Sequence, residues 1–307
     1  MKDIRVIFMG TPDFAVPILE YLIDNTNVIL VVTQPDKEVG RDKKVSFSPV
    51  KKVALANNIA LFQPAKIRKD YQLIQELQPD LIITCAFGQI LPKEVLDAAS
   101  LGALNVHASL LPKYRGSSPI QWALLNGDKV TGVSLMYMDE KMDTGDVIGQ
   151  LECPIEEKDN VGTLHDKLSL LGVDILKQEL PNIINSTNKR TKQDDKDASY
   201  TKMIAREDEL IDFNEEGQKM INKIRAFNPW PVAYFRLNGH DIKVYEATFI
   251  KKEKQIPKQV MITKDTLSIT CQDGIINLLR IKPFGKKEMD IKAFINGINR
   301  DGDFYVG

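Results

Sequence analysis

Two residues that could donate hydrogen bonds and move a proton stand two positions apart in this chain, Asn105 and His107. They belong to the segment LNVHASLLPKYRG, residues 104–116, which begins with the alternating pattern of a strand and ends as a polar loop. Successive side chains of a strand point to opposite faces, so the two residues share a face while Val106 points into the core. An amide donor beside an imidazole suits the stabilisation of an oxyanion and a proton transfer. The pair therefore predicts an acyl-transfer site, provided that an acid reaches His107.

Candidate acids follow in a glycine-containing loop after the predicted strand 132–138: Asp139, Glu140, Asp143 and Asp146. A carboxylate aimed at His107 would fix its tautomer and favour its charged form. Most acids in such loops are solvated turn formers. The spacing alone does not decide which acid, if any, reaches the histidine.

The loop after the pair is unusually apolar: Ser109, Leu110, Leu111 and Pro112. Its leucines could fold back under the sheet as packing. They could equally form a rigid hydrophobic wall for a flat ligand, with main-chain groups free to bond it. The residues alone leave both interpretations open.

A second loop, TQPDKEVGRDKK at 33–44, is longer than a minimal connection and carries a small excess of basic residues: Lys37, Arg41, Lys43 and Lys44. Long loops of this kind are often functional. The charge run is typical of a solvated, mobile loop, and the alternative is a loop that meets phosphates.

These residues must be positioned by an alternation of strand-like and helix-like segments in the first half of the chain. The alternation predicts a three-layer α/β domain over residues 1–188. Residues 187–202 are polar throughout and almost free of large apolar groups, which predicts a linker over residues 189–205. Short strand patterns separated by Gly, Asn and Asp turns then predict a small antiparallel barrel over 206–307.

Composition limits the classes of function. The 307 residues suffice for about two domains. With 41 Lys and Arg against 42 Asp and Glu, the net charge gives no support to a dedicated nucleic-acid binder, although a local basic patch remains possible. Three scattered cysteines without CxxC spacing indicate a reduced, cytoplasmic compartment and no zinc site. No apolar run approaches the ~20 residues that cross a membrane.

The motifs together resemble one known family. The segment NVHASLLPKYRG with the downstream LMYMDEKMDTGD loop resembles the folate-dependent formyltransferases. The stretches VIFMGTPDFAVPIL, TQPDKEVGRDKK and RAFNPWPVAYF are similar to the members of that family that act on methionyl-tRNA. The resemblance runs over nearly the whole chain. It implies a Rossmann-like formyltransferase domain followed by a smaller OB-like β-barrel domain.

The resemblance also implies a reaction. The formyl group of 10-formyltetrahydrofolate would pass to the α-amino group of methionine on initiator tRNA, giving formylmethionyl-tRNA for translation initiation. Asn105 and His107 would stabilise a tetrahedral intermediate, and Asp143, matched through the motif KMDTGD, would orient His107. No metal is implied.

By the same resemblance, residues 109–112 would contact the folate, and Arg41, Lys43 and Lys44 would approach the tRNA together with the C-terminal domain. Here Asp42 stands where the family usually has Gly or a basic residue, which weakens the positive field of this loop.

Two alternatives remain open. The chain could formylate another amine, such as a glycinamide ribotide or a nucleotide sugar, or it could be a catalytically silent tRNA- or folate-binding module. The C-terminal barrel and the FNPWPVAY stretch argue against the first. The intact set of Asn105, His107 and Asp143 argues against the second.

Overall fold

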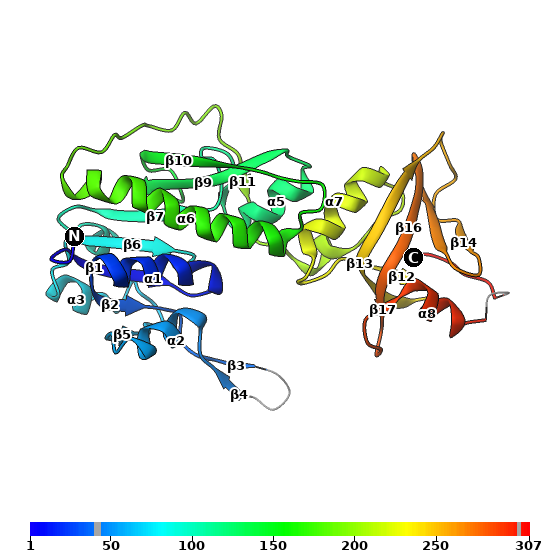
Figure 1. Ribbon diagram of the computed structural model, residues 1–307, viewed down its shortest axis with the longest axis horizontal. Coiled ribbons are helices and arrows are strands. Elements are labelled where there is room, and N and C mark those ends of the chain that lie inside the picture. The colour runs from blue at the N-terminus through cyan, green and yellow to red at the C-terminus, as the bar shows by residue number, and fades with distance from the viewer. Residues whose placement is uncertain (40–43, 300–301) are drawn as a thin grey trace. The chain divides into compact units, whose positions relative to one another are not determined.

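The computed structural model describes residues 1–39, 44–299 and 302–307, which divide into two compact units (Figure 1). Unit 1 comprises Met1–Pro119, Val130–Pro154 and His165–Thr201. Unit 2 comprises Ile120–Lys129, Ile155–Leu164 and Lys202–Gly307. The two units are therefore not separated at one position in the sequence. Residues 120–129 and 155–164, which precede residue 188, group with the C-terminal part of the chain.

Unit 1 is built on a seven-stranded sheet in the order β10-β9-β7-β6-β1-β2-β5. Its strands are β1 (Arg5–Gly10), β2 (Asn27–Val32), β5 (Leu61–Phe62), β6 (Leu81–Cys85), β7 (Ala103–His107), β9 (Val130–Tyr137) and β10 (Val147–Pro154). The pairs from β7 to β5 are parallel, and β9 and β10 extend the sheet antiparallel. The central strands are continuous apolar runs because both of their faces are buried.

Helices cover both faces of this sheet. They are α1 (Val16–Asn25), α2 (Pro49–Ala56), α3 (Gln72–Glu76), α4 (Lys93–Leu96) and α6 (Val161–Ile184), with a 3₁₀ turn at Asp13–Ala15. On one face, α6 packs tightly against α1 and β7, since a Cβ atom on Gly172 would lie 2.9 Å from Ile18 and 3.2 Å from Val106. The predicted three-layer arrangement is thereby confirmed.

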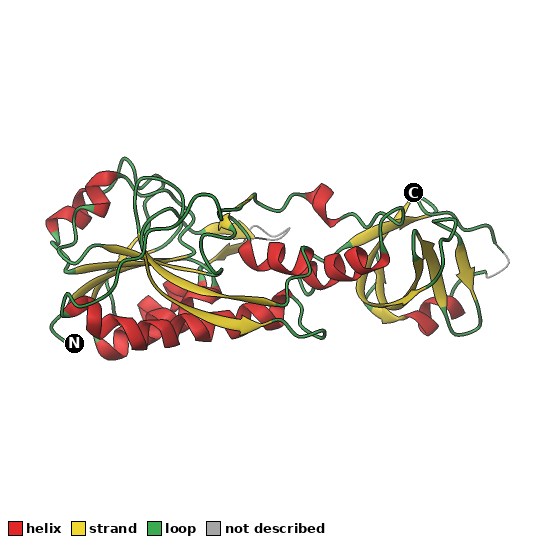
Figure 2. Ribbon diagram, turned by 90° about the horizontal axis from the view of Figure 1, so that it is seen from above, coloured by secondary structure: helices red, strands yellow, loops and turns green. Residues whose placement is uncertain are grey.

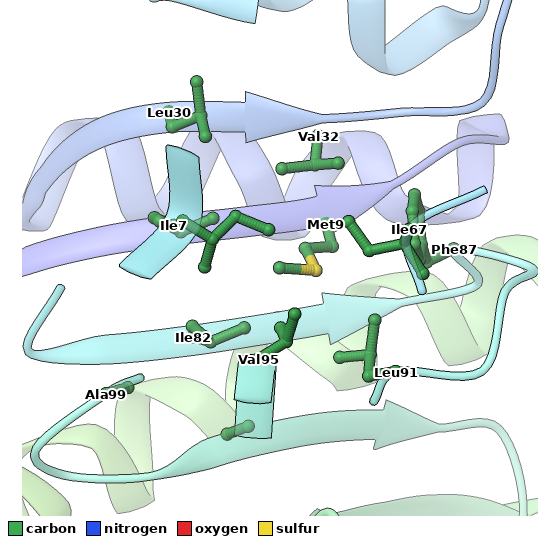
Figure 3. Packing of buried hydrophobic residues seen from close by; sticks show 12 residues of the cluster. Ile7, Met9, Leu30, Val32, Ile67, Ile82, Phe87, Leu91, Val95 and Ala99 are labelled. Carbon is green, nitrogen blue, oxygen red and sulfur yellow. The ribbon is translucent and has the colours of Figure 1, made fainter. Parts of the chain in front are cut away.

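The other face holds the cluster shown in Figure 3. Its strand residues include Ile7, Met9 and Ile82, and Ile74 of α3 and Val95 of α4 pack onto them. All five residues are fully buried. This is also the face of Asn105 and His107, because the side chains of β7 alternate with Val106 on the α6 side. The packed cluster therefore gives the candidate residues a rigid base.

Part of the segment predicted as a linker packs on unit 1. The main chains of Thr191 and Val147 exchange two hydrogen bonds of 2.8 Å. Strand β11 (Tyr200–Thr201) then pairs in parallel with β8 (Arg115–Gly116). The polar segment is thus held by its backbone and side chains, which its lack of apolar groups did not indicate.

Unit 2 contains an antiparallel sheet in the order β12-β13-β16-β15-β14, with β17 beside β16. Its elements are α5 (Pro119–Leu125), a 3₁₀ turn at Arg206–Glu209, α7 (Gly217–Phe227), β12 (Tyr234–Leu237), β13 (His240–Lys251), β14 (Val260–Ile262), β15 (Leu267–Cys271), β16 (Gly274–Pro283), β17 (Met289–Asp290) and α8 (Ile291–Asn296). Figure 2 shows these strands curving around a common interior. Within the described ranges no ladder joins β14 to β12, so the predicted barrel is an open half-barrel.

Candidate active site

Asn105 and His107 stand at the carboxyl end of β7, between two strands that fix them. Asn105 is in register with Thr84 of β6, and His107 is in register with Ser134 of β9. The Thr84 hydroxyl lies 2.9 Å from Asn105 Oδ1 and donates to it. With its oxygen so engaged, the Asn105 amide presents its NH₂ group away from β6. Carboxyl ends of strands border the ligand crevice in open α/β sheets.

Asp143 is the acid that faces the pair. Its Oδ1 lies 3.4 Å from Asn105 Nδ2 and 3.8 Å from His107 Nδ1, and its Oδ2 accepts a 2.8 Å hydrogen bond from the main-chain N–H of Gly116. Asp139, in contrast, accepts from Thr144 within its own turn. Of the four acids that the spacing left open, the structure thus places Asp143 beside the pair, and its role there stays a prediction.

The His107 ring is held from its other side as well. Its Nε2 lies 2.9 Å from the carbonyl oxygen of Tyr114, an acceptor, so Nε2 carries a proton. Nδ1 then faces the Asp143 carboxylate. The ring is 6% exposed and is shielded from bulk water. Both ring nitrogens of His107 therefore face oxygen atoms.

The apolar loop after β7 is packed within unit 1. Ser109 is fully buried, and its hydroxyl donates to the Lys113 carbonyl at 2.7 Å. Leu111 packs with Met136 and Val147. The side chains of Ser109 and Leu111 are therefore engaged in packing and internal hydrogen bonds. Contact of residues 109–112 with folate stays a prediction, for which Leu110 and Pro112, both partly exposed, offer the accessible side chains.

The basic residues predicted to meet tRNA fall largely outside the described part of the chain. Arg41 and Lys43 lie outside the described residues. Lys44 begins β4 (Lys44–Ser46), which pairs with β3 (Lys37–Val39), but its side chain is also outside the description. Their role stays a prediction.

A cavity of about 1290 Å³ lies in unit 1 beside the turn that carries Asp143. Leu96, Ala103 and Met138 contribute apolar surface, and Asp139 and Lys141 line it from the turn. The Met138 sulfur lies 3.2 Å from the Thr84 hydroxyl, which in turn holds Asn105. Thr84 thus links Met138, which lines the cavity, to Asn105 of the candidate active site.

The sequence did not single out three groups that hold the site: the Thr84 hydroxyl, the Gly116 N–H and the Gln193 side chain. Thr84 had a detectable signal, since it is polar at the end of an otherwise apolar strand. Gln193 had none, because it lies in the polar segment after α6. Among the described residues, no group of three His, Cys, Asp or Glu side chains is placed to bind a metal ion.

No helix in the described part of the chain is long and apolar enough to cross a membrane. Solved structures share the fold. An N-formyltransferase from Helicobacter canadensis, in complex with folinic acid and dTDP-3-aminofucose, aligns with a TM-score of 0.66 and 23% identity, over 91% of this chain and 100% of that one. HypX from Aquifex aeolicus, in complex with tetrahydrofolic acid, aligns with a TM-score of 0.64 and 17% identity, over 99% of this chain and 51% of that one.

Sequence comparisons extend over both units. Residues 2–180 match the formyl transferase family and residues 203–299 match the formyl transferase C-terminal domain. The methionyl-tRNA formyltransferase of Staphylococcus epidermidis is 48% identical, over 96% of each chain. That of Bacillus subtilis is 44% identical, over 99% of this chain and 98% of its own. With these similarities spanning the sheet that holds Asn105, His107 and Asp143 as well as the C-terminal half-barrel, the chain belongs to the methionyl-tRNA formyltransferases of the formyl transferase family.

Proposed function

We propose that this enzyme transfers the formyl group of 10-formyltetrahydrofolate to the α-amino group of methionine on initiator tRNA. The observation that carries the proposal is the convergence of three side chains from two separate segments, with Asp143 Oδ1 within 3.8 Å of both Asn105 Nδ2 and His107 Nδ1. The near full-length similarity to methionyl-tRNA formyltransferases supports the choice of amine.

Attack of a neutral amine on the formyl carbon places negative charge on the formyl oxygen. Asn105 is suited to donate to that oxygen, because Thr84 occupies its carbonyl and leaves its NH₂ group oriented. His107 can donate to the formyl oxygen from Nε2 once this oxygen replaces the Tyr114 carbonyl as the acceptor of that N–H. Such exchange lets the substrate replace an internal acceptor without leaving a buried donor unpaired.

Asp143 would act through His107. When the amine loses its proton to His107, the imidazole becomes positively charged. The carboxylate beside Nδ1 stabilises that charged state. The Gly116 N–H holds the carboxylate in place. The proton would then pass to the departing folate nitrogen. Positioning and charge stabilisation by these three side chains supply the rate enhancement in this mechanism.

We place the folate in the 1290 Å³ cavity, with its flat ring against Leu96, Ala103 and Met138. This site would bring the formyl group toward Asn105 past Thr84, since Thr84 touches both Met138 and Asn105. Residues 109–112 do not line this cavity, so their contact with the folate is a separate prediction. The tRNA would be bound by the loop with Arg41, Lys43 and Lys44 and by unit 2. All three cysteines are described, are buried and form no disulfide bond, which supports a reducing, cytoplasmic location.

Substrate choice tests the proposal. The enzyme is given 10-formyltetrahydrofolate with charged initiator tRNA, a glycinamide ribotide or an amino-sugar nucleotide, and the formylated product is measured by mass spectrometry. We expect formylmethionine released from the tRNA and no formylation of the small amines. Formylation of only a small amine would overturn the proposal, and tight tRNA binding without turnover would indicate a silent binding module.

A further inference from the structure

The turn that carries Asp143 is held in place by a side chain from a distant segment. Gln193 Nε2 donates to two main-chain carbonyls of this turn, those of Asp143 at 2.9 Å and Gly145 at 2.8 Å. Gln193 is 50 residues from Asp143 in sequence and lies in the polar segment that packs on unit 1. Its amide therefore touches the main chain of the residue whose carboxylate faces His107.

This turn needs an external support. Asp143 has a φ of 55°, a left-handed conformation that a side chain other than glycine adopts at a cost. Gly145 lies against the end of β9, where a Cβ atom would be 1.9 Å from the Tyr137 carbonyl oxygen. The turn is thus strained at Asp143 and packed closely against β9 at Gly145. Hydrogen bonds to the main-chain carbonyls of the turn therefore help to orient the Asp143 carboxylate.

Gln193 is in turn oriented by a buried arginine. Arg115 is 0% exposed, and its Nε donates to Gln193 Oε1 at 2.9 Å while its Nη1 donates to Asp195 and to the Tyr200 hydroxyl, each at 2.8 Å. Because Oε1 accepts from Arg115, the amide NH₂ of Gln193 has to face the turn. Arg115 also precedes Gly116, whose N–H binds the Asp143 carboxylate. One β8 dipeptide therefore holds both the main chain and the side chain of Asp143.

We propose that Gln193 is a positioning residue for formyl transfer, oriented by Arg115, and that it acts by fixing the Asp143 turn. The proposal rests on the function proposed above, because it needs Asp143 to act on His107. Gln193 also lines the cavity in which the folate is placed, but its positioning role depends only on its bonds to the Asp143 turn.

The substitution Gln193→Glu isolates this role. A carboxylate keeps the size of the side chain and the acceptor for Arg115 Nε, but it replaces the NH₂ donor with an oxygen that faces two carbonyl oxygens. We expect kcat to fall roughly 10-fold to 100-fold, as for the loss of two hydrogen bonds. The KM for methionyl-tRNA should stay near that of the wild type. The kcat values are compared at saturating 10-formyltetrahydrofolate, because Gln193 also lines the cavity in which the folate is placed. Gln178→Glu, on the exposed side of α6, makes the same chemical change without these contacts and should leave kcat unchanged.

A double-mutant cycle with Asp143→Asn separates positioning from a general structural effect. If Gln193 acts through Asp143, adding Gln193→Glu to Asp143→Asn lowers kcat by less than about twofold further. If the two losses multiply, Gln193 acts elsewhere and the proposal is overturned. A Gln193→Glu enzyme with wild-type kcat also overturns it. Should the glutamate variant fail to fold, Gln193→Met, which lacks both the donor and the charge, is measured in the same cycle with the same criteria.

The cycle also separates this inference from the function on which it rests. If the wild type formylates methionyl-tRNA and Asp143→Asn is as fast, the assignment of Asp143 fails and the Gln193 proposal fails with it. If Asp143→Asn is slow and Gln193→Glu is normal, only the Gln193 proposal fails.

Discussion

Replacing Asp143 with asparagine removes one charge from the site while keeping the shape of the side chain. The two oxygens of Asp143 face opposite sides of the site. Oδ2 accepts from the Gly116 N–H, and Oδ1 faces the Asn105 amide donor Nδ2 and lies 3.8 Å from His107 Nδ1. An asparagine has only one oxygen. Whichever way it turns, its NH₂ group meets a donor, so the variant both loses the charge and misplaces one hydrogen bond.

The size of the effect follows from the 3.8 Å between His107 Nδ1 and Asp143 Oδ1. With an effective dielectric constant of about 20, two unit charges at that separation attract by about 4 kcal/mol. This attraction exists only once the imidazole is charged, which the mechanism places in the transition state. Since each 1.36 kcal/mol of barrier is tenfold in rate, kcat should fall by about 10³.

Steady-state and single-turnover formylation of methionyl-tRNA measure this loss. We expect the KM for 10-formyltetrahydrofolate to change by less than about threefold, since the interaction is made in the transition state. Asp174→Asn is the matched control, because Asp174 is exposed on α6 and pairs only with Lys177 among the described residues. A folded Asp143→Asn enzyme with near-normal kcat would refute the reasoning.

Three further predictions follow from single contacts. Thr84→Val removes the hydroxyl that orients Asn105. It should lower kcat roughly tenfold in a steady-state assay, with little change in the Tm of thermal unfolding. A normal kcat would show that Asn105 needs no such support. Gly145→Ala places a Cβ atom 1.9 Å from the Tyr137 carbonyl, so the turn must move and kcat should fall by at least about 10²-fold; unchanged kinetics would contradict the packing of this turn. Burial raises the pKa of the Cys85 thiol, which keeps it protonated, so a thiol reagent at neutral pH should label it only after denaturation; stoichiometric labelling of Cys85 in the native protein would contradict this.

Much of the site was predictable because strand geometry is local. The alternation of β7 is sufficient to place Asn105 and His107 on one face. The resemblance to formyltransferases was needed to select Asp143. The Asp143 carboxylate is held beside His107 by the N–H of Gly116, which is 27 residues away in the sequence. Local patterns carry no information about such a long-range bond.

The apolar Leu110–Leu111 loop and the polar segment after α6 show what local patterns leave undecided. Leu111 is packed in a small cluster with Met136, which local sequence could not distinguish from a ligand wall. The segment around Gln193 lacks large apolar residues, so its composition predicted a solvated linker. Its polar side chains instead bond to Arg115 and to the Asp143 turn, and hydrogen-bond partners of this kind leave no periodic signal.

The most direct test of the account is the single-turnover rate of formyl transfer to methionyl-tRNA by His107→Ala, with both substrates saturating. Loss of a positioned donor to the formyl oxygen, together with the group that accepts the amine proton, should lower this rate by at least about 10²-fold. Binding of the folate, measured by calorimetry, should be largely unchanged. A His107→Ala enzyme that transfers formyl at a rate close to wild type would contradict the central role given to the Asn105, His107 and Asp143 site.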